Sequence, residues 1–376
     1  MMRQFIALCL LSSAIAWLPS LDAKAQQEPI PIQYFGLHIH HADKGTAWPN
    51  VPFGSWRLWD AFVDWPNLEP SAGKWNFSKL DRYVALAAQH NVEILLPLAN
   101  SPQWASARSK EPSAYQTGYA SEPANIDYWR NYVRTVGERY KGRIRHYEIW
   151  NEPNIKQHFS GSPAKLIELT CEAFRILKSI DPQNKIISPA SSVGGKDHLG
   201  YLDHFLASGG KKCIDIIGHH FYVTNSGPEA MVPLIRQVRS IMIKYGVDQM
   251  PLWNTETGWW LANGDGTPDL PMVARGGWKK IPLDDKDNIV FRAFVLARAE
   301  GVERFYWYAW DNGALGFIET KTKKPKPITE KWRGAVNNLL GATGLRCVQE
   351  SNIWRCDYIK ANGVKEQVSW TTDSPG

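Results

Sequence analysis

Eight short apolar runs recur along the chain, separated by longer segments with the periodicity of helices. The runs lie at residues 34–40, 55–61, 92–98, 144–151, 185–189, 214–222, 251–257 and 304–310. Alternation of this kind is typical of βαβ units, in which helices cover a sheet of parallel strands. Eight such units in a chain of 376 residues predict an α/β protein whose fold is the (β/α)8 TIM barrel.

Helices are expected between these runs and after the last one. The expected segments are residues 77–89, 126–140, 163–180, 199–207, 228–245, 284–300 and 331–340. Pro163 and Pro228 stand at first-turn positions, which proline favours because that turn needs no backbone N–H donor. An open, doubly wound sheet is the alternative architecture. It is disfavoured because no glycine-rich phosphate turn follows the first run.

The pattern changes to period-two alternation after the last expected helix. Residues 346–348, 353–359 and 367–370 predict three short strands, which are too few to form an independent domain. We therefore divide the chain into a signal peptide at 1–25, a catalytic barrel at 26–345 and a short β extension at 346–376 that packs on the barrel.

The first 25 residues have the pattern of a secretory signal. Arg3 precedes a 14-residue apolar stretch at 5–18, and Ala23-Lys24-Ala25 offers a small-x-small cleavage site. The stretch is too short to span a bilayer, and no later segment is long and apolar enough to be an integral membrane segment. The expected location is therefore outside the cytoplasm, either secreted or periplasmic.

Cysteine usage agrees with export. Apart from Cys9 in the leader, the chain has an even set of four cysteines, which in an oxidising compartment suggests two disulfides. Cys347 and Cys356 flank a strand-turn-strand pattern, so their pairing has the easiest geometry. Cys171 and Cys213 would then pair by elimination, with free buried thiols as the alternative for these two.

Charge and motifs exclude several classes of function. The net charge is +6, but the basic residues are dispersed apart from a loop-like run at 321–326, so no nucleic-acid partner is expected. There is no Gly-x-Ser-x-Gly elbow for serine chemistry. The clustered histidines match no zinc spacing, so neither a metal nor another cofactor is expected. These histidines are His38, His40, His41, His219 and His220.

Two glutamates end expected strands of the barrel. The fourth run finishes in Asn151-Glu152-Pro153 and the seventh in Thr255-Glu256. Because the carboxyl ends of all strands of a parallel barrel meet at one face, both carboxylates are expected there. Facing carboxylates are what glycosidic bond cleavage requires, one to protonate the leaving oxygen and one to attack the anomeric carbon.

The two carboxyl groups must differ in pKa to take these two roles. Glu152 lies between the apolar Trp150 and Pro153, which predicts a raised pKa suited to an acid/base. Arg57 on the second run and Tyr222 at the end of the sixth are expected to hold Glu256 ionised.

These motifs resemble those of a known group of enzymes. Trp-Asn-Glu-Pro at 150–153, together with Thr-Glu at 255–256, resembles clan A of the glycoside hydrolases. Three further stretches, at 56–60, 101–106 and 306–311, are similar to family 39 of that clan, and especially to its bacterial exopolysaccharide-degrading branch. The resemblance covers roughly residues 35–311. Larger members of the family carry an accessory β-sandwich, which here is reduced to a flap.

The resemblance implies roles for individual residues. Glu152 would be the acid/base and Glu256 the nucleophile of a retaining double displacement. The expected substrate-binding residues around them are Asn151 for the hydroxyl next to the anomeric carbon, Arg57 and Tyr222 as supports of the nucleophile, His220 in the same pocket, Trp310 as the platform under the sugar, and Trp104 and Trp259 as walls of neighbouring subsites.

The expected function is that of a monomeric, retaining, endo-acting β-glycoside hydrolase. Its expected partner is a polysaccharide or oligosaccharide substrate, with a bacterial exopolysaccharide and a role in biofilm turnover as the leading hypothesis. An exo-acting β-xylosidase or xylanase-like enzyme is the alternative, and the long segment 261–282 is expected to decide between them. A non-catalytic sugar-binding barrel is a remote alternative, because the intact glutamate pair argues against it.

Overall fold

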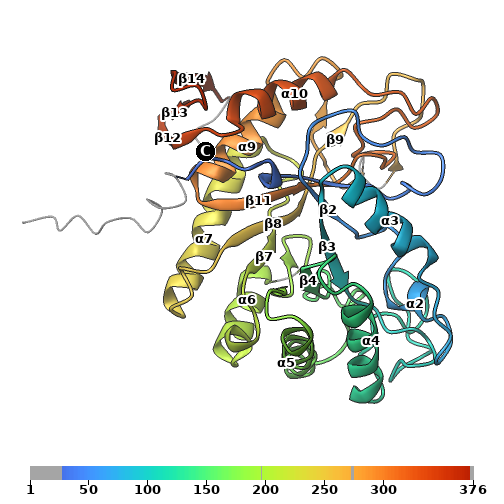
Figure 1. The fold of residues 1–376 in the computed structure, drawn as a ribbon. Coiled ribbons are helices and arrows are strands. Elements are labelled where there is room, and N and C mark those ends of the chain that lie inside the picture. Colours follow the sequence, from blue (N-terminus) through green and yellow to red (C-terminus); the bar gives the residue numbers. More distant parts are fainter. Residues whose placement is uncertain (1–27, 196, 272–274, 373–376) are drawn as a thin grey trace, which may run out of the picture.

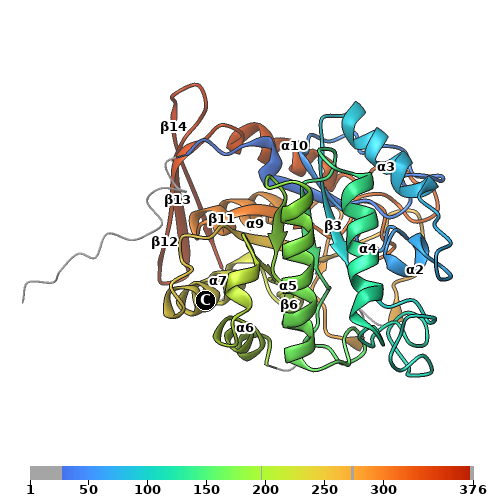
Figure 2. The same ribbon diagram turned by 60° about the horizontal axis from the view of Figure 1, so that its bottom comes forward.

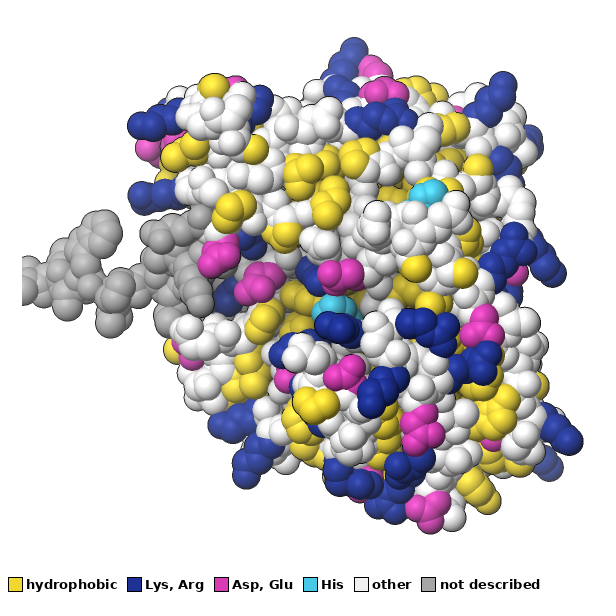
Figure 3. Space-filling view, in the orientation of Figure 1, with side chains coloured by type: hydrophobic (Ala, Val, Ile, Leu, Met, Phe, Trp, Pro, Cys, Tyr) yellow, Lys and Arg dark blue, Asp and Glu magenta, His cyan; other side chains and the backbone are white. Residues whose placement is uncertain are grey.

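The computed structural model describes residues 28–195, 197–271 and 275–372. The expected signal peptide at 1–25 lies outside this described part of the chain. Within it, no helix combines the length and the apolar character needed to cross a membrane. Figure 3 shows one face of the molecule, on which basic and acidic side chains are interspersed rather than gathered by sign.

A parallel sheet closes into the predicted barrel (Figure 1). Its strands are β1 (Phe35–His38), β2 (Ser55–Arg57), β3 (Glu93–Leu98), β4 (His146–Ile149), β5 (Lys185–Ile187), β6 (Ser191–Ser192), β7 (Ile217–His220), β8 (Leu252–Thr257) and β11 (Val302–Trp307). The order is β5-β4-β3-β2-β1-β11-β8-β7-β6, and every described ladder in this sheet is parallel. β5 lies within the fifth predicted run at 185–189, and β6 follows just beyond the end of that run. A bridge from Ile187 to Ile216 joins the fifth run to the sixth and closes the ring.

Helices surround the barrel, as the sequence predicted (Figures 1 and 2). They are α2 (Trp65–Leu68), α3 (Ser78–Gln89), α4 (Ile126–Arg139), α5 (Pro163–Ile180), α6 (His198–Ala207), α7 (Met231–Lys244), α9 (Ile289–Ala299) and α10 (Ile328–Leu339). The start of α5 shows the local cause, because Ser162 caps it by accepting a hydrogen bond from the Lys165 N–H and Pro163 fills the first turn.

Two expected helix starts were placed too early. Pro228 opens a short 3₁₀ turn, η3 (Pro228–Ala230), before α7 begins. The helix expected from residue 284 begins only at Ile289. Asp285 and Asn288 have positive φ values of 35° and 51°, so the chain makes a turn here instead of a helix. The Asp285 carboxylate accepts the Ile289 N–H at 3.0 Å and so caps α9.

The C-terminal residues form the expected small sheet beside the barrel (Figure 2). β12 (Thr343–Glu350), β13 (Ile353–Ile359) and β14 (Lys365–Thr371) pair antiparallel. The sheet is tied to the barrel by Trp370, whose indole N–H donates to Glu229 at 2.7 Å and whose ring lies 5.6 Å from the Arg292 guanidinium. This three-stranded sheet therefore packs against the barrel near α9.

Both disulfide pairings considered from the sequence are present. Cys347 faces Cys356 across β12 and β13, and Cys171 of α5 is bonded to Cys213 of η2 (Gly210–Cys213). The second bond closes a far longer loop, with a sequence separation of 42 against 9. A longer loop restricts the unfolded chain more strongly.

Replacing Cys171 and Cys213 by serine is therefore expected to lower the free energy of unfolding by about 4 kcal/mol. The same change at Cys347 and Cys356 is expected to cost less, about 3 kcal/mol, because its loop is shorter. Urea denaturation followed by circular dichroism measures both. A larger loss at the short-loop pair would show that loop length does not govern these bonds.

Candidate active site

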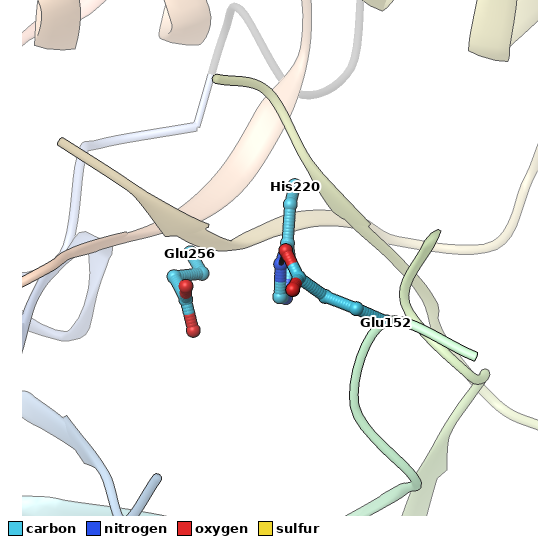
Figure 4. Close-up of side chains that lie close together, drawn as sticks. All are labelled: Glu152, His220 and Glu256. Atoms are coloured by element: carbon cyan, nitrogen blue, oxygen red, sulfur yellow. Dashed lines mark hydrogen bonds and ion pairs between the residues drawn. The ribbon is translucent and has the colours of Figure 1, made fainter. Parts of the chain in front are cut away.

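Glu152 and Glu256 lie at the carboxyl ends of the fourth and seventh barrel strands. Glu256 belongs to β8, and Glu152 follows β4, where its N–H donates to the Ala190 carbonyl at 3.0 Å. A carboxylate oxygen of each glutamate and a ring nitrogen of His220 all lie within 4.8 Å of one another. Figure 4 shows the two glutamates approaching from separate segments, with the His220 ring beside the Glu152 carboxylate. The predicted meeting of the two side chains is therefore what the fold produces.

The turn that presents Glu152 has an uncommon backbone. Trp150 and Glu152 have positive φ values of 65° and 45°, a region that side-chain-bearing residues rarely adopt. Trp150 is buried and its indole N–H donates to the His158 carbonyl at 2.8 Å, which ties the turn to the following loop. The surrounding contacts thus hold a strained turn that points Glu152 toward Glu256.

Glu256 is held by two hydrogen-bond donors. Arg57 Nη1 lies 2.8 Å from one carboxylate oxygen, and the Tyr222 hydroxyl donates to the other at 2.9 Å. The sequence predicted that Arg57 and Tyr222 hold Glu256 ionised, but burial outweighs the lowering by His220 and Arg57 and raises the pKa of Glu256 above its ordinary value. These two donors fix the orientation of the Glu256 carboxylate.

Arg57 connects three residues of the site through separate nitrogens. Besides Glu256, its Nη2 donates to Asn151 Oδ1 at 2.7 Å and its Nε to Glu148 at 2.6 Å. The guanidinium is fully buried. Because its planar donors are rigidly spaced, Arg57 sets the positions of these groups relative to one another. Glu148 was not singled out from the sequence, although an acid inside an apolar strand run was a usable signal.

The surroundings of Glu152 correct one expectation. The sequence predicted a raised pKa from apolar Trp150 and Pro153, but Trp150 packs into the core against Phe159. His220 Nδ1 lies 3.1 Å from one oxygen of Glu152, and His158 Nδ1 lies 3.2 Å from the other. Burial alone would raise the pKa of Glu152, but the bonds from the two imidazoles outweigh it and hold the pKa well below the ordinary value.

Replacing His158 by phenylalanine is expected to move the basic limb of the pH–activity profile upward by about one pH unit. The change removes an interaction that favours ionised Glu152, so its pKa rises and the protonated form persists to higher pH. Measurement of kcat/KM against pH on an aryl glycoside tests this. An unchanged basic limb would show that His158 does not influence the pKa of Glu152.

Other sequence-predicted residues fall into two groups. Asn151, Arg57, His220 and Tyr222 surround the glutamate pair, as described above. The second group consists of the three tryptophans proposed to stack on sugars, Trp104, Trp259 and Trp310. They do not present exposed ring faces around the glutamate pair.

Trp259 and Trp310 are buried in the core, so the prediction that they stack on sugars is wrong. Trp259 is 0% exposed and packs against Trp307, 5.1 Å between ring centroids. Trp310 is 2% exposed and stacks on Phe317. Trp104 is half-buried, and its indole N–H donates to the Glu69 carbonyl. None of the contacts described for Trp104 reaches either glutamate.

Three aromatic residues that sequence reasoning missed lie near the pair. The half-buried Tyr308 donates its hydroxyl to Asp60 at 2.5 Å, and Tyr115 donates to the same carboxylate at 3.1 Å. The Tyr115 ring lies 6.0 Å from the ring of His158. On the other side, the half-buried Trp278 lies 5.9 Å from the ring of Tyr222. Tyr308 lies within the eighth predicted run, directly after β11, and could have been found, whereas the other two lie in loops without a recognisable signal.

A cavity of about 310 Å³ adjoins the site on the Tyr115 side. Trp59, Asp60, Asn100 and Tyr119 contribute to its lining. A shallower depression of about 460 Å³ shares Tyr115 and Tyr119 with this cavity and continues to Pro102 and Gln103. The two hollows are therefore neighbours, with Tyr115 between them.

The cluster of Glu152, His220 and Glu256 offers three donor atoms close enough to share a cation. Arg57, however, already places a positive charge 2.8 Å from the Glu256 carboxylate. A second cation at this distance would be repelled, which favours the interpretation of the cluster as a reaction centre.

The closed parallel barrel with a glutamate pair at its carboxyl end defines the class, that of the clan A glycosidases. The family follows from the sequence model described as "Glycosyl hydrolases family 39", which matches residues 67–261. The chain belongs to glycosyl hydrolase family 39, which confirms the resemblance found in the motifs.

Curated relatives are similar over part of their length. Endo-1,4-beta-xylanase C of Paenibacillus barcinonensis is 23% identical over 240 residues, which are 56% of this chain and 21% of that protein. A beta-xylosidase of Caldicellulosiruptor saccharolyticus is 23% identical over 199 residues, 48% of this chain and 40% of that protein. The chain thus spans less than half the length of these two relatives.

Solved structures share the fold. A family 39 glycoside hydrolase from Bacteroides cellulosilyticus WH2 superposes with a TM-score of 0.69 at 16% identity, covering 93% of this chain and 71% of that one. A monomeric beta-xylosidase from Caulobacter crescentus CB15 gives a TM-score of 0.62 at 17% identity, covering 88% and 74%. At such low identity these likenesses establish the barrel alone.

Proposed function

We propose that the protein is a retaining β-glycoside hydrolase. The observation that carries the proposal is the approach of Glu152 and Glu256 to within 4.8 Å. Retaining enzymes hold their two carboxyl groups about 5–5.5 Å apart, whereas inverting enzymes need roughly 6.5–9.5 Å to admit a water molecule between sugar and base. The approach of these carboxylate oxygens fits the shorter, retaining separation better than the inverting one.

In the first step, Glu256 attacks the anomeric carbon and forms a glycosyl–enzyme ester. Arg57 and Tyr222 hold its two oxygens, so the attacking oxygen is already oriented. Glu152 gives a proton to the departing oxygen. His158 and His220 each contact one oxygen of Glu152 and so hold its carboxyl group in place for this transfer.

In the second step, Glu152 takes a proton from water, and that water cleaves the ester with net retention of configuration. Asn151 offers its amide N–H to the sugar hydroxyl beside the anomeric carbon. Its carbonyl oxygen is already occupied by Arg57, which fixes which end of the amide faces the sugar. This pre-orientation favours the charge distribution of the transition state.

We further propose internal cleavage of a polymer. The two neighbouring hollows at Tyr115, one of which reaches Gln103, offer room for sugar units beyond the cleaved bond. An exo-acting enzyme would instead need a closed pocket. A bacterial exopolysaccharide is the proposed substrate, with the protein acting as a secreted or periplasmic monomer in biofilm turnover. The two disulfides support an oxidising compartment.

The test is a hydrolysis screen against bacterial exopolysaccharides, xylan and aryl β-glycosides. Proton NMR of the first product should show the β-anomer before mutarotation. An early fall in viscosity with little monosaccharide indicates internal cleavage, whereas release of xylose from chain ends would favour the β-xylosidase alternative. The folded Glu256→Gln variant is the control. An α-anomer as first product would refute retention.

A further inference from the structure

Glu148 is a buried acid behind the candidate reaction centre. Its side chain is inaccessible to solvent, and one oxygen lies 2.6 Å from Arg57 Nε. The other oxygen has no hydrogen-bond partner within the described part of the chain. A buried ion pair contributes little net stability compared with apolar packing, so its presence calls for another explanation.

The barrel wall is shaped around this carboxylate. A methyl group added at Gly218 of β7 would lie 3.3 Å from Glu148 Oε1 and 2.8 Å from a methyl group of Ile187. A glycine at this position therefore leaves the space that the Glu148 carboxylate needs. The packing around Glu148 therefore holds its carboxylate inside the barrel, at a fixed position relative to Arg57.

Arg57 consequently serves two carboxylates at once. Its positive charge is divided between Glu148 at 2.6 Å and Glu256 at 2.8 Å. The further charged or titratable groups that act on Glu256 come from several elements. They are His220 of β7, Tyr222 after β7, Glu152 after β4, Asp60 after β2, Tyr115 before α4 and Tyr308 after β11. Arg57 is the one permanent cation that acts on Glu256 together with these groups. Any residue that shares the charge of Arg57 therefore alters the pKa of Glu256.

We propose that Glu148 is a positioning residue for the hydrolytic reaction. It fixes the Arg57 guanidinium so that this one group meets both Glu256 and Asn151, and its negative charge limits how strongly Arg57 stabilises the Glu256 carboxylate. Glu256 thereby stays basic enough to attack the sugar. The inference rests on the proposed function, in which Glu256 is the nucleophile.

The isosteric variant E148Q separates charge from shape, because a glutamine can still accept from Arg57 Nε. Loss of one negative charge favours ionised Glu256, so its pKa falls. The acid limb of kcat/KM should therefore move to lower pH by about one pH unit. Carbon-13 NMR of glutamate carboxyl groups should show the same shift directly. The Glu256 signal is identified by its absence in Glu256→Gln.

The variant E148D keeps the charge but shortens the reach toward Arg57. It should leave the acid limb in place and lower kcat roughly tenfold with little change in KM, since Arg57 is displaced. E172Q is the matched control, because Glu172 also pairs with an arginine, Arg130, but on the surface of α5. It should change neither the acid limb nor kcat.

An unshifted Glu256 titration in E148Q would overturn the inference, as would a shift of equal size in E148D. Should E148Q not fold, wild-type kcat in E148D would overturn it as well. The proposed hydrolase function and the role of Glu148 can be refuted separately. Absence of hydrolysis by the wild-type protein refutes the proposed function, whereas the NMR titration of Glu256 still decides whether Glu148 controls that carboxylate.

Discussion

Replacing Glu256 by glutamine is expected to lower kcat on an aryl β-glycoside by roughly 10⁴-fold or more, because the variant has no carboxylate to form the covalent intermediate. The fold should persist, since the glutamine oxygen can still accept from Arg57 and its amide N–H can donate to the Tyr222 hydroxyl oxygen. Steady-state kinetics measure the loss, and circular dichroism verifies folding. Turnover close to that of the wild type would remove Glu256 from the mechanism.

A smaller side chain at this position provides a chemical control. In Glu256→Ala, azide has room to attack the anomeric carbon from the face that the carboxylate used. Activity should then return with added azide, and the product should be the α-glycosyl azide, inverted relative to a β-linked substrate. Formation of the β-azide would place the nucleophile elsewhere.

Replacing Glu152 by glutamine is expected to have the second-largest effect, and that effect should depend on the leaving group. For substrates whose leaving group needs a proton, the rate should fall by roughly 10²–10⁴-fold. For a dinitrophenyl glycoside, which departs without help, the first step should remain fast. The second step should slow, because no base activates the water.

The signature of this variant is therefore a burst of dinitrophenol followed by slow turnover. Rapid-mixing absorbance measurements would detect the burst, and mass spectrometry would detect the glycosyl–enzyme ester on Glu256. In Glu152→Ala with azide, the product should be the β-glycosyl azide. An equal loss for good and poor leaving groups would contradict the acid/base role of Glu152.

The sequence was sufficient for the barrel because each strand and helix carries its own periodic signal. α5 and β13, for example, have the predicted bounds. The meeting of Glu152 and Glu256 was also predictable, since parallel strands bring their carboxyl ends to one face. The geometry of the parallel barrel, rather than local propensity, predicted that Glu152 and Glu256 meet although they lie about one hundred positions apart.

Side-chain direction beyond a strand end was not predictable. β8 ends at Thr257 and β11 at Trp307, so the alternation of a strand no longer fixes where Trp259 and Trp310 point. Both turned into the core. The imidazole contact of His158 with Glu152 depends on how a loop folds back, and no spacing rule describes that path.

The left-handed turn at Trp150 and Glu152 has a consequence for engineering this protein. Such a conformation costs on the order of 1–3 kcal/mol for each residue that carries a side chain. A search for thermostable variants would therefore favour glycine at position 152, because glycine adopts a positive φ without this cost. Selection for heat resistance alone would tend to discard the acid/base, so stability and turnover should be screened together.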